Sequence, residues 1–264
     1  MQRWAGRVAM VTGASAGIGA AIAYQLQDVG MNVVALARGV DKIPGAVEAA
    51  RSEAAGRGRS VAAKAAAPGK LLCRACDVQR EADITAAFAW AKEALGGVDV
   101  LVNCAGLAGD TRLLDTNTSD WKKVLDINVL GLSICTREAI QQMRARGVDD
   151  GHVVHISSVC GHIMPFLPEW SMYHASKHAV RVLTEGLRKE LVAAKSRIRV
   201  TEVSPGMVRT SFLNETRSAN PEEWYAQRAH LFPEDVADAV LYALGTPPHV
   251  QIHEIMIKPI GEEA

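Results

Sequence analysis

The stretch Val8-Ala9-Met10-Val11-Thr12-Gly13-Ala14-Ser15-Ala16-Gly17-Ile18-Gly19 is a short apolar run that leads directly into three glycines and a predicted helix. Glycines at these places allow a tight turn, close approach of the backbone to a pyrophosphate, and close packing of the helix. The helix N-terminus offers free N–H groups and a positive dipole to phosphates. The spacing is Gly-x-x-x-Gly-x-Gly instead of Gly-x-Gly-x-x-Gly, but the strand, turn and helix follow in the required order. The stretch therefore predicts a dinucleotide-binding turn at the start of an α/β fold.

Apolar runs of the same kind recur along the chain, with amphipathic helical segments between them. Strands as apolar as that over 98–103 are typical of sheets covered on both faces. Strands are expected over 7–12, 32–37, 71–76, 98–103, 151–157, 197–204 and 253–258. Helices are expected near 17–29, 41–56, 80–95, 118–146, 172–195 and 233–244. This alternation predicts an α/β fold, a doubly wound (Rossmann) seven-stranded parallel sheet flanked by helices on both faces.

Composition limits the classes of protein to which the chain can belong. With 264 residues, 48% hydrophobic and 22% charged, it can bury a large core, so global disorder is excluded. One domain over 1–264 is the first expectation and two domains the alternative, with 57–70 as a surface insertion. The 29 basic and 29 acidic residues create no overall field for nucleic acid or an acidic membrane. Without a signal peptide or an apolar run of about 18 residues, a soluble cytoplasmic protein is expected.

The five cysteines and eight histidines are not arranged as a typical metal site. Cys73 and Cys76 have the spacing of a metal or redox pair, but no second pair or histidine set accompanies them. Buried thiols in or beside a short strand are the favoured interpretation, and no metal is predicted. His155, inside the fifth expected strand, is interpreted as a packed or hydrogen-bonded histidine.

The end of the second expected strand indicates which dinucleotide is preferred. An NAD-binding fold usually places Asp or Glu there for the ribose 2′-hydroxyl, whereas this chain reads Ala35-Leu36-Ala37-Arg38-Gly39. A carboxylate that would repel a 2′-phosphate is missing, and the Arg38 guanidinium can bind one. The pattern favours NADP over NAD, and a solvated surface arginine is the alternative.

A later segment, Tyr173-His174-Ala175-Ser176-Lys177, is expected on a helix, with Ser157-Ser158 upstream at a strand end. Residues four apart share a helix face, so Lys177 can lie beside the Tyr173 hydroxyl. A phenol of pKa about 10 is a poor base at neutral pH, but a nearby ammonium and an oxidised nicotinamide favour the phenolate. Tyr173 is therefore a candidate proton donor and acceptor.

Together these motifs resemble the classical short-chain dehydrogenase/reductase family along essentially the whole chain. The matching pieces are Gly13, Gly17 and Gly19; Asp77-Val78; Asn103-Cys104-Ala105-Gly106; Asn128; Ser157-Ser158; Tyr173 with Lys177; and Pro205-Gly206 with Thr210. Cys104 departs from the Asn that the family usually has. The resemblance implies subunit contacts through the helices near 118–146 and 172–195, and hence a homodimer or homotetramer.

The resemblance also implies roles for individual residues. Ser158 and Tyr173 would hold the substrate oxygen, Tyr173 would transfer the proton, Lys177 would bind the nicotinamide ribose and lower the tyrosine pKa, and Asn128 would hold a relay water. Ser157 is the alternative to Ser158. The residues expected to bind the cofactor are Gly13, Ser15, Gly17, Ile18, Gly19, Arg38, Asp77, Val78, Asn103, Ala105, Gly106, Tyr173, Lys177, Pro205, Gly206, Val208 and Thr210.

Family geometry places two apolar segments, 162–170 and 206–230, over the nicotinamide. The expected substrate pocket comprises Ser158, His162, Met164, Phe166, Met207 and Phe212, although some of these side chains can instead pack on the core or on a partner subunit. The segments 132–138, 148–152 and 246–259 resemble the animal branch that includes member-11-type dehydrogenase/reductases and insect farnesol dehydrogenases. The expected activity is NADP-dependent interconversion of an apolar alcohol and its carbonyl. A farnesol-like alcohol is favoured, a ketosteroid or general carbonyl reductase is the alternative, and a non-catalytic NADP-binding regulator is the rival from another class.

Overall fold

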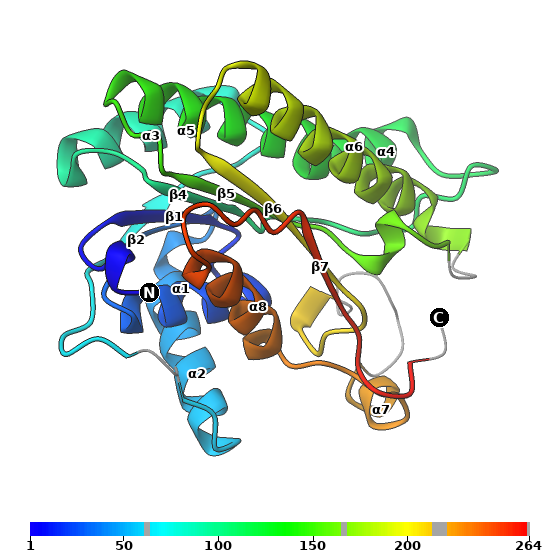
Figure 1. Ribbon diagram of the computed structural model, residues 1–264. Coiled ribbons are helices and arrows are strands. Elements are labelled where there is room, and N and C mark those ends of the chain that lie inside the picture. Colours follow the sequence, from blue (N-terminus) through cyan, green and yellow to red (C-terminus); the bar gives the residue numbers. More distant parts are fainter. Residues whose placement is uncertain (61–63, 165–167, 213–220, 263–264) are drawn as a thin grey trace.

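The computed structural model describes residues 1–60, 64–164, 168–212 and 221–262, and its centre is a seven-stranded parallel sheet (Figure 1). The strands are β1 (Val8–Thr12), β2 (Asn32–Ala37), β3 (Leu71–Ala75), β4 (Val100–Asn103), β5 (His152–Ile156), β6 (Arg199–Pro205) and β7 (Glu254–Ile257). Their order is β3-β2-β1-β4-β5-β6-β7. The order reverses between β1 and β4, and this is the point at which doubly wound sheets bind ligands beyond the carboxyl ends of their strands. The predicted fold class is confirmed.

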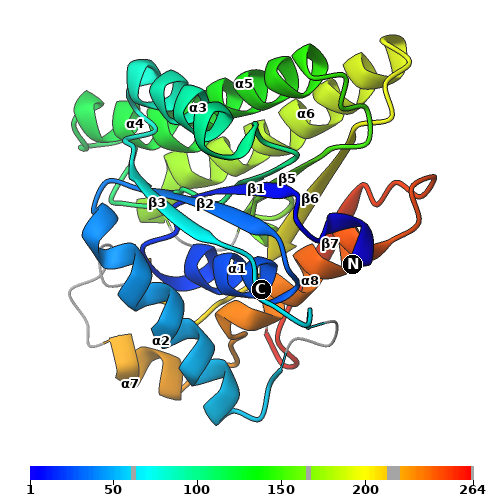
Figure 2. The same ribbon diagram turned by 90° about the vertical axis from the view of Figure 1, so that its left-hand side faces the viewer.

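Helices cover both faces of the sheet, in two layers that Figure 2 shows edge-on. One layer contains α1 (Gly17–Asp28), α2 (Ile43–Gly56) and α8 (Pro233–Gly245). The other contains α3 (Glu81–Leu95), α4 (Thr118–Leu125), α5 (Leu132–Ala145) and α6 (Ser171–Ala193). Because side chains alternate along a strand, Ala9 and Val11 of β1 pack in the first layer and Val8 and Met10 in the second. The sheet is therefore buried on both sides, as its near-continuous apolar strands predict.

One expected helix is interrupted. The segment expected near 118–146 consists of α4, a π-helical stretch over Asp126–Gly131, and α5. A π-helical turn takes up an extra residue within a helix without ending it, and such turns are frequent at functional sites. Asn128 lies within this turn. A short helix that was not expected, α7 (Pro221–Ala226), lies within the 206–230 segment.

The beginning of the 57–70 segment is attached to the start of α8. Arg57 bonds the Glu234 carboxylate through Nε at 2.6 Å, and its guanidinium lies 4.4 Å from the centroid of the Phe232 ring. Arg59 forms a further ion pair with Asp235 at 3.0 Å. The side chains of residues 57–60 are exposed, so ion pairs and not burial hold this part of the insertion against the fold.

The sequence predicts structural roles for His155 and for the cysteines. His155 is buried and bonds Thr184 at 2.8 Å and Thr136 at 3.1 Å. All five cysteines are free thiols; Cys76, directly after β3, is buried as predicted, whereas Cys73 within β3 is only half-buried. In the part of the chain that the structure describes, no helix is both long enough and apolar enough to cross a bilayer.

Candidate active site

The glycine turn after β1 forms a cradle that is open at the N-terminus of α1. Gly13 has φ +71°, and a Cβ atom there would lie 2.8 Å from the Ala105 backbone. A Cβ atom on Gly19 would lie 2.3 Å from the Gly13 carbonyl oxygen, closer than real side chains approach. The turn is joined to the end of β4 because the Thr12 hydroxyl accepts hydrogen bonds from the Cys104 and Ala105 amides, each at 3.0 Å. Glycine is thus required here by the close approach of backbone to backbone.

A cavity of about 810 Å³ extends from this cradle along the carboxyl ends of the strands. Its size suits a small-molecule or cofactor site. The expected site residues that line it are Gly13, Ser15, Gly17, Ile18, Gly19, Arg38, Asp77, Val78, Ala105, Gly106, Ser158, Tyr173, Lys177, Pro205, Gly206, Met207, Val208, Thr210 and Phe212. Segments that lie far apart in the sequence therefore meet around a single hollow.

Arg38 gives the part of the cavity beside β2 a positive charge. Ala37 and Arg38 line it at the strand end, and Arg38 is exposed. Among the residues that the structure describes, Arg38 forms no ion pair and is free to bind an anion. Asp77 lies nearby in the lining, and its carboxylate accepts a hydrogen bond from the Gln79 amide at 3.1 Å. The backbone N–H groups at the glycine turn and the Arg38 guanidinium together fit the phosphates of a dinucleotide.

Tyr173, Lys177 and Ser158 meet on the opposite wall of the cavity. Lys177 donates a hydrogen bond to the Ile156 carbonyl oxygen at 3.0 Å, and its Nζ lies 5.5 Å from the centroid of the Tyr173 ring. The side chain of Ser158 hydrogen-bonds Tyr173, and its Oγ also accepts from the Cys160 amide at 3.1 Å. The neighbouring Ser157 also lines the cavity, and its side chain faces Glu202. The helical spacing of Tyr173 and Lys177 thus brings a phenol and an ammonium to one surface.

Burial controls the protonation of this pair. Removal from water raises the pKa of Tyr173, and the hydrogen bond from Ser158 lowers it by less. Burial likewise lowers the pKa of Lys177 to about 8. Desolvation sets the direction of the Tyr173 shift in the protein alone, and the lowering of this pKa by Lys177 that the family resemblance implies stays a prediction. The phenol is held protonated, in the form that can donate a proton.

Asn128 and Asn103 are buried and are not among the residues that line the cavity. Asn128 donates from Nδ2 to the Leu107 carbonyl oxygen at 2.8 Å, and its Oδ1 accepts from the Leu107 amide at 2.8 Å. It also donates to the Ser176 hydroxyl at 3.0 Å, while Asn103 donates to the Thr136 hydroxyl at 3.0 Å. Asn128 thereby connects the π-helical turn to the cavity-lining segment after β4.

Aromatic rings pack against the ring of Tyr173. Trp170 packs edge-on against Tyr173 with centroids 5.3 Å apart, and the centroid of Phe212 lies 5.8 Å from that of Tyr173. Met207 belongs to the same apolar cluster. The candidate substrate end of the cavity therefore has an apolar surface beside the Tyr173 and Ser158 hydroxyls, and the Glu262 carboxylate lies next to Met207.

Three residues expected in the substrate pocket are placed differently or not described. His162 hydrogen-bonds Glu254 at 2.5 Å and is not part of the cavity lining. Met164 is 68% exposed and is also absent from the lining. Phe166 lies outside the described residues. A sequence pattern places these residues in the loop before Tyr173 but does not determine which way their side chains point.

Several residues of the lining could not be expected from the sequence, and two of them make hydrogen bonds that matter for the shape of the cavity. Glu262, near the chain end, lines the cavity and accepts a hydrogen bond from the Met207 amide at 3.4 Å. Tyr225 of α7 also lines it and donates to the Val208 carbonyl oxygen at 3.0 Å. Neither belongs to a local motif, so no sequence signal was available for them. Both support the segment that follows β6.

Comparison with known proteins shows the family to which this arrangement of residues belongs. The family model for short chain dehydrogenases matches residues 7–221. The chain belongs to the short-chain dehydrogenase family. A farnesol dehydrogenase from Aedes aegypti is 49% identical over 264 residues, covering 100% of both chains. The dehydrogenase/reductase SDR family member 11 from Bos taurus is 47% identical and covers 98% of each chain.

A solved structure supports the same family. The closed form of a serine dehydrogenase complexed with NADP+ has a TM-score of 0.80, with 28% identity over 97% of this chain and 96% of the other. The family assignment makes the protein an oxidoreductase acting on a small substrate. The recognition made from the motifs is thus confirmed, both for the family and for the branch that its close relatives represent.

Proposed function

We propose that the protein is an NADP-dependent oxidoreductase that interconverts an apolar alcohol and its aldehyde or ketone, with Tyr173 as the general acid and base. The observation that carries this proposal is the single cavity that joins the glycine cradle and Arg38 at one end to Ser158, Tyr173 and Lys177 at the other. A farnesol-like isoprenoid alcohol is the favoured substrate. A ketosteroid or general carbonyl reductase activity is the second candidate, supported by the likeness to the member-11 relatives.

The protein side chains supply proton transfer and orientation. When bound, NADP(H) donates or accepts the hydride at the carbon that carries the substrate oxygen. In reduction, the developing alkoxide takes the phenolic proton of Tyr173, which burial keeps on the side chain, while Ser158 holds the same oxygen. Lys177 and Tyr173 would contact the nicotinamide ribose. In oxidation the alcohol proton moves to Tyr173, so the phenolate form must first be generated.

Cofactor selection in this proposal rests on Arg38. Its guanidinium stands at the end of β2, where the chain has no acid to bind a ribose 2′-hydroxyl. A 2′-phosphate would find a charged donor there and no repelling carboxylate. The NADP+ bound in the solved serine dehydrogenase supports the same choice.

The substrate class follows from the apolar wall and from the relatives. Trp170, Phe212 and Met207 offer a surface on which an isoprenoid or steroid skeleton would be removed from water. The farnesol dehydrogenase relative favours the isoprenoid alcohol. The proposal also includes a cytoplasmic location and assembly as a homodimer or homotetramer. A non-catalytic regulator is disfavoured because Ser158, Tyr173 and Lys177 are all present and line the same cavity.

The deciding experiment follows nicotinamide absorbance at equal concentrations of NADP and NAD. The panel contains farnesol, a short secondary alcohol and a hydroxysteroid, together with the matching carbonyls and reduced cofactor. Turnover of farnesol with NADP is the expected result, and turnover only of the steroid or small carbonyl would select the second candidate. Tight cofactor binding without turnover of any member would favour the regulator, and a preference for NAD would contradict the cofactor assignment.

A further inference from the structure

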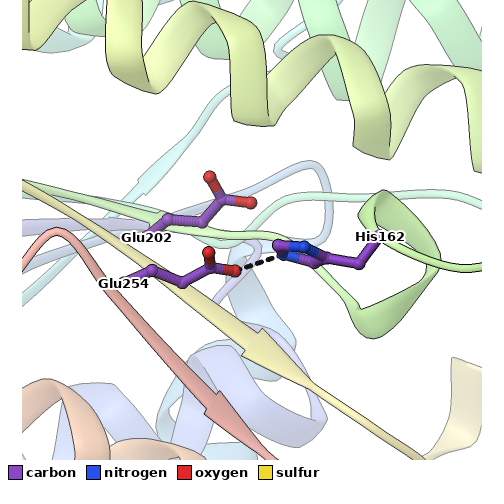
Figure 3. Close-up of side chains that lie close together, drawn as sticks. All are labelled: His162, Glu202 and Glu254. Atoms are coloured by element: carbon purple, nitrogen blue, oxygen red, sulfur yellow. Dashed lines mark hydrogen bonds and ion pairs between the residues drawn. The ribbon is translucent and has the colours of Figure 1, made fainter.

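A polar cluster of His162, Glu202 and Glu254 lies outside the lining of the main cavity (Figure 3). His162 follows the turn over Val159–Gly161, Glu202 lies in β6, and Glu254 begins β7. The two glutamates are register partners in the parallel pair of β6 and β7. One imidazole nitrogen and one oxygen from each carboxylate all lie within 4.8 Å of one another. Three separate chain segments therefore direct metal-binding atoms to a single point.

The cluster brings two carboxylates and one imidazole together, and the buried Lys177 ammonium acts on Glu202 without forming an ion pair with it. Glu202 is only 2% exposed, and it forms no ion pair with any lysine or arginine that the structure describes. The Glu254 carboxylate directly beside it is 27% exposed, and its ion-pair partner is His162. Two like charges opposed across strands destabilise a sheet, and a buried carboxylate without a cation is costly. A bound cation would remove both penalties.

A second observation, on Ser157, points to a ligand at the same place. Ser157, which also lines the main cavity, is 4% exposed; its side chain faces the Glu202 carboxylate, and its hydroxyl has no partner within ordinary hydrogen-bond geometry. A buried hydroxyl without a partner is uncommon in folded proteins. Ser204, on the neighbouring side, donates to Glu254 at 2.6 Å and thereby fixes the orientation of that carboxylate. The Ser157 hydroxyl can therefore donate to or accept from a ligand, while the hydrogen bond from Ser204 holds the Glu254 carboxylate in place.

We propose that His162, Glu202 and Glu254 bind a divalent transition-metal cation, with Zn²⁺ as the best fit. One imidazole and two carboxylates are ligand types that Zn²⁺ accepts in a four-coordinate site, with water or the Ser157 hydroxyl available as the fourth ligand. Metal–ligand bonds of about 2.0–2.2 Å place tetrahedral ligand atoms roughly 3.4 Å apart. His162 Nε2 and Glu254 Oε1, now 2.5 Å apart, would separate by roughly 1 Å. The cation would replace the hydrogen bond between these two atoms, and His162 would bind it as a neutral imidazole with its proton on Nδ1.

The place of the cluster in the fold suggests what the cation would do. His162 begins the segment that leads to Trp170, whose ring packs against Tyr173. Glu202 and Glu254 belong to the sheet. A cation bound by all three would therefore attach the start of the loop before α6 to two strands and stabilise the folded state.

The test uses the full-length protein, dialysed against a chelator and then titrated with Zn²⁺. Bound zinc is measured by competition with a chromophoric chelator, and the Tm is measured at each concentration. We expect one Zn²⁺ per chain and a Tm raised by roughly 5 °C or more once free Zn²⁺ is about 100 times Kd. Absence of both binding and a Tm shift would overturn the proposal, as would an equal response to Mg²⁺.

Variants assign the binding to the cluster. Glu254→Gln and Glu202→Gln preserve shape and are each expected to weaken Zn²⁺ binding more than about tenfold. Glu48→Gln makes the same chemical change on the exposed surface of α2 and serves as the matched control. Cooperative unfolding in the absence of metal shows that each variant folds. If Glu202→Gln does not fold, Glu254→Gln, at a partly exposed side chain, tests the site alone. Unchanged zinc affinity in the folded variants would assign the metal to another place, such as the free cysteines, and contradict the proposal.

Discussion

Lys177 lies over the ring of Tyr173, with Nζ 5.5 Å from the ring centroid, and donates to the Ile156 carbonyl oxygen at 3.0 Å. Both side chains are buried, so each is displaced toward its neutral form: the pKa of Tyr173 is raised and that of Lys177 is lowered. The pair is therefore electrically neutral at moderately alkaline pH unless a ligand supplies charge. This property makes both stability and activity sensitive to pH.

The buried ammonium of Lys177 should make the free energy of unfolding depend on pH. The pKa of Lys177 is about 8 in the folded protein and 10.5 in the unfolded chain, so between these values the unfolded state binds more protons. The free energy of unfolding should therefore rise with pH from about 8 to 10, and the full burial penalty should be present below pH 8. In urea unfolding, the free energy of unfolding of wild type should increase over this interval by about 2 kcal/mol more than that of Lys177→Met. Lys92→Met, on the exposed surface of α3, is the control, and parallel pH curves for wild type and Lys177→Met would contradict the assignment.

Removal of one oxygen atom tests the proton donor. Tyr173→Phe keeps the ring packed against Trp170 and Phe212 but removes the group that exchanges the proton. We expect kcat to fall by about 10²–10⁴, with the Kd for NADP changed by no more than a few-fold. Tyr242→Phe, at a side chain that is 64% exposed, should leave both values unchanged. Stopped-flow absorbance and cofactor fluorescence measure the two quantities, and full turnover by Tyr173→Phe would eliminate the proposed mechanism.

The elements whose determinants are local could be predicted from the sequence. The apolar run before Gly13, the glycine spacing and the helix after it are contiguous, and so are Tyr173 and Lys177 on one helix face. Burial of each strand on both faces is visible in its composition, which is why the parallel sheet could be expected. The break at Asn128 could not be predicted, because a π-helical turn interrupts the hydrogen bonds without interrupting the apolar pattern.

Contacts between residues that are far apart in the sequence could not be predicted from it. His162 and Glu254 are separated by 92 positions and meet because β7 lies beside β6. Glu262 reaches the cavity for the same reason, since the chain returns past Gly206 after β7. The protonation of Tyr173 was expected from its charged neighbour, but the degree of burial decides it.

Arg38 offers a direct test of cofactor choice. Arg38→Ala removes the guanidinium at the end of β2 and leaves the backbone cradle intact, so only binding of the 2′-phosphate should suffer. A charged hydrogen bond is worth about 1.5–3 kcal/mol, so the kcat/KM for NADP should fall roughly 10- to 100-fold while that for NAD changes little. Arg144→Ala, exposed on α5, is the matched control. An unchanged NADP-to-NAD ratio in Arg38→Ala would show that another residue selects the cofactor.

A single methyl group added to the glycine turn should weaken binding of the cofactor. In Gly19→Ala the added Cβ would meet the Gly13 carbonyl oxygen at 2.3 Å, and since that atom belongs to the backbone the turn itself must shift. We expect the Kd for NADP to rise more than tenfold. Gly45→Ala, in α2 with no atom within 4 Å of the new Cβ, should instead stabilise the protein by about 0.5–1 kcal/mol. Calorimetric titration and thermal unfolding separate the two effects, and unchanged binding in Gly19→Ala would contradict the close approach.

Asn128 is expected to act by positioning the cavity wall. Its amide exchanges two hydrogen bonds with Leu107, which lines the cavity, and Nδ2 also donates to Ser176. Asn128→Asp keeps the shape but replaces the donor Nδ2 with an oxygen, so the buried Leu107 carbonyl faces a carboxylate. Stability should fall by about 2–3 kcal/mol, and the KM for NADP should rise by a larger factor than kcat falls, because the displaced segment contacts the cofactor site. Asn117→Asp, exposed before α4, provides the control. A loss confined to kcat, with unchanged stability, would instead assign Asn128 to the proton relay that the family resemblance implies.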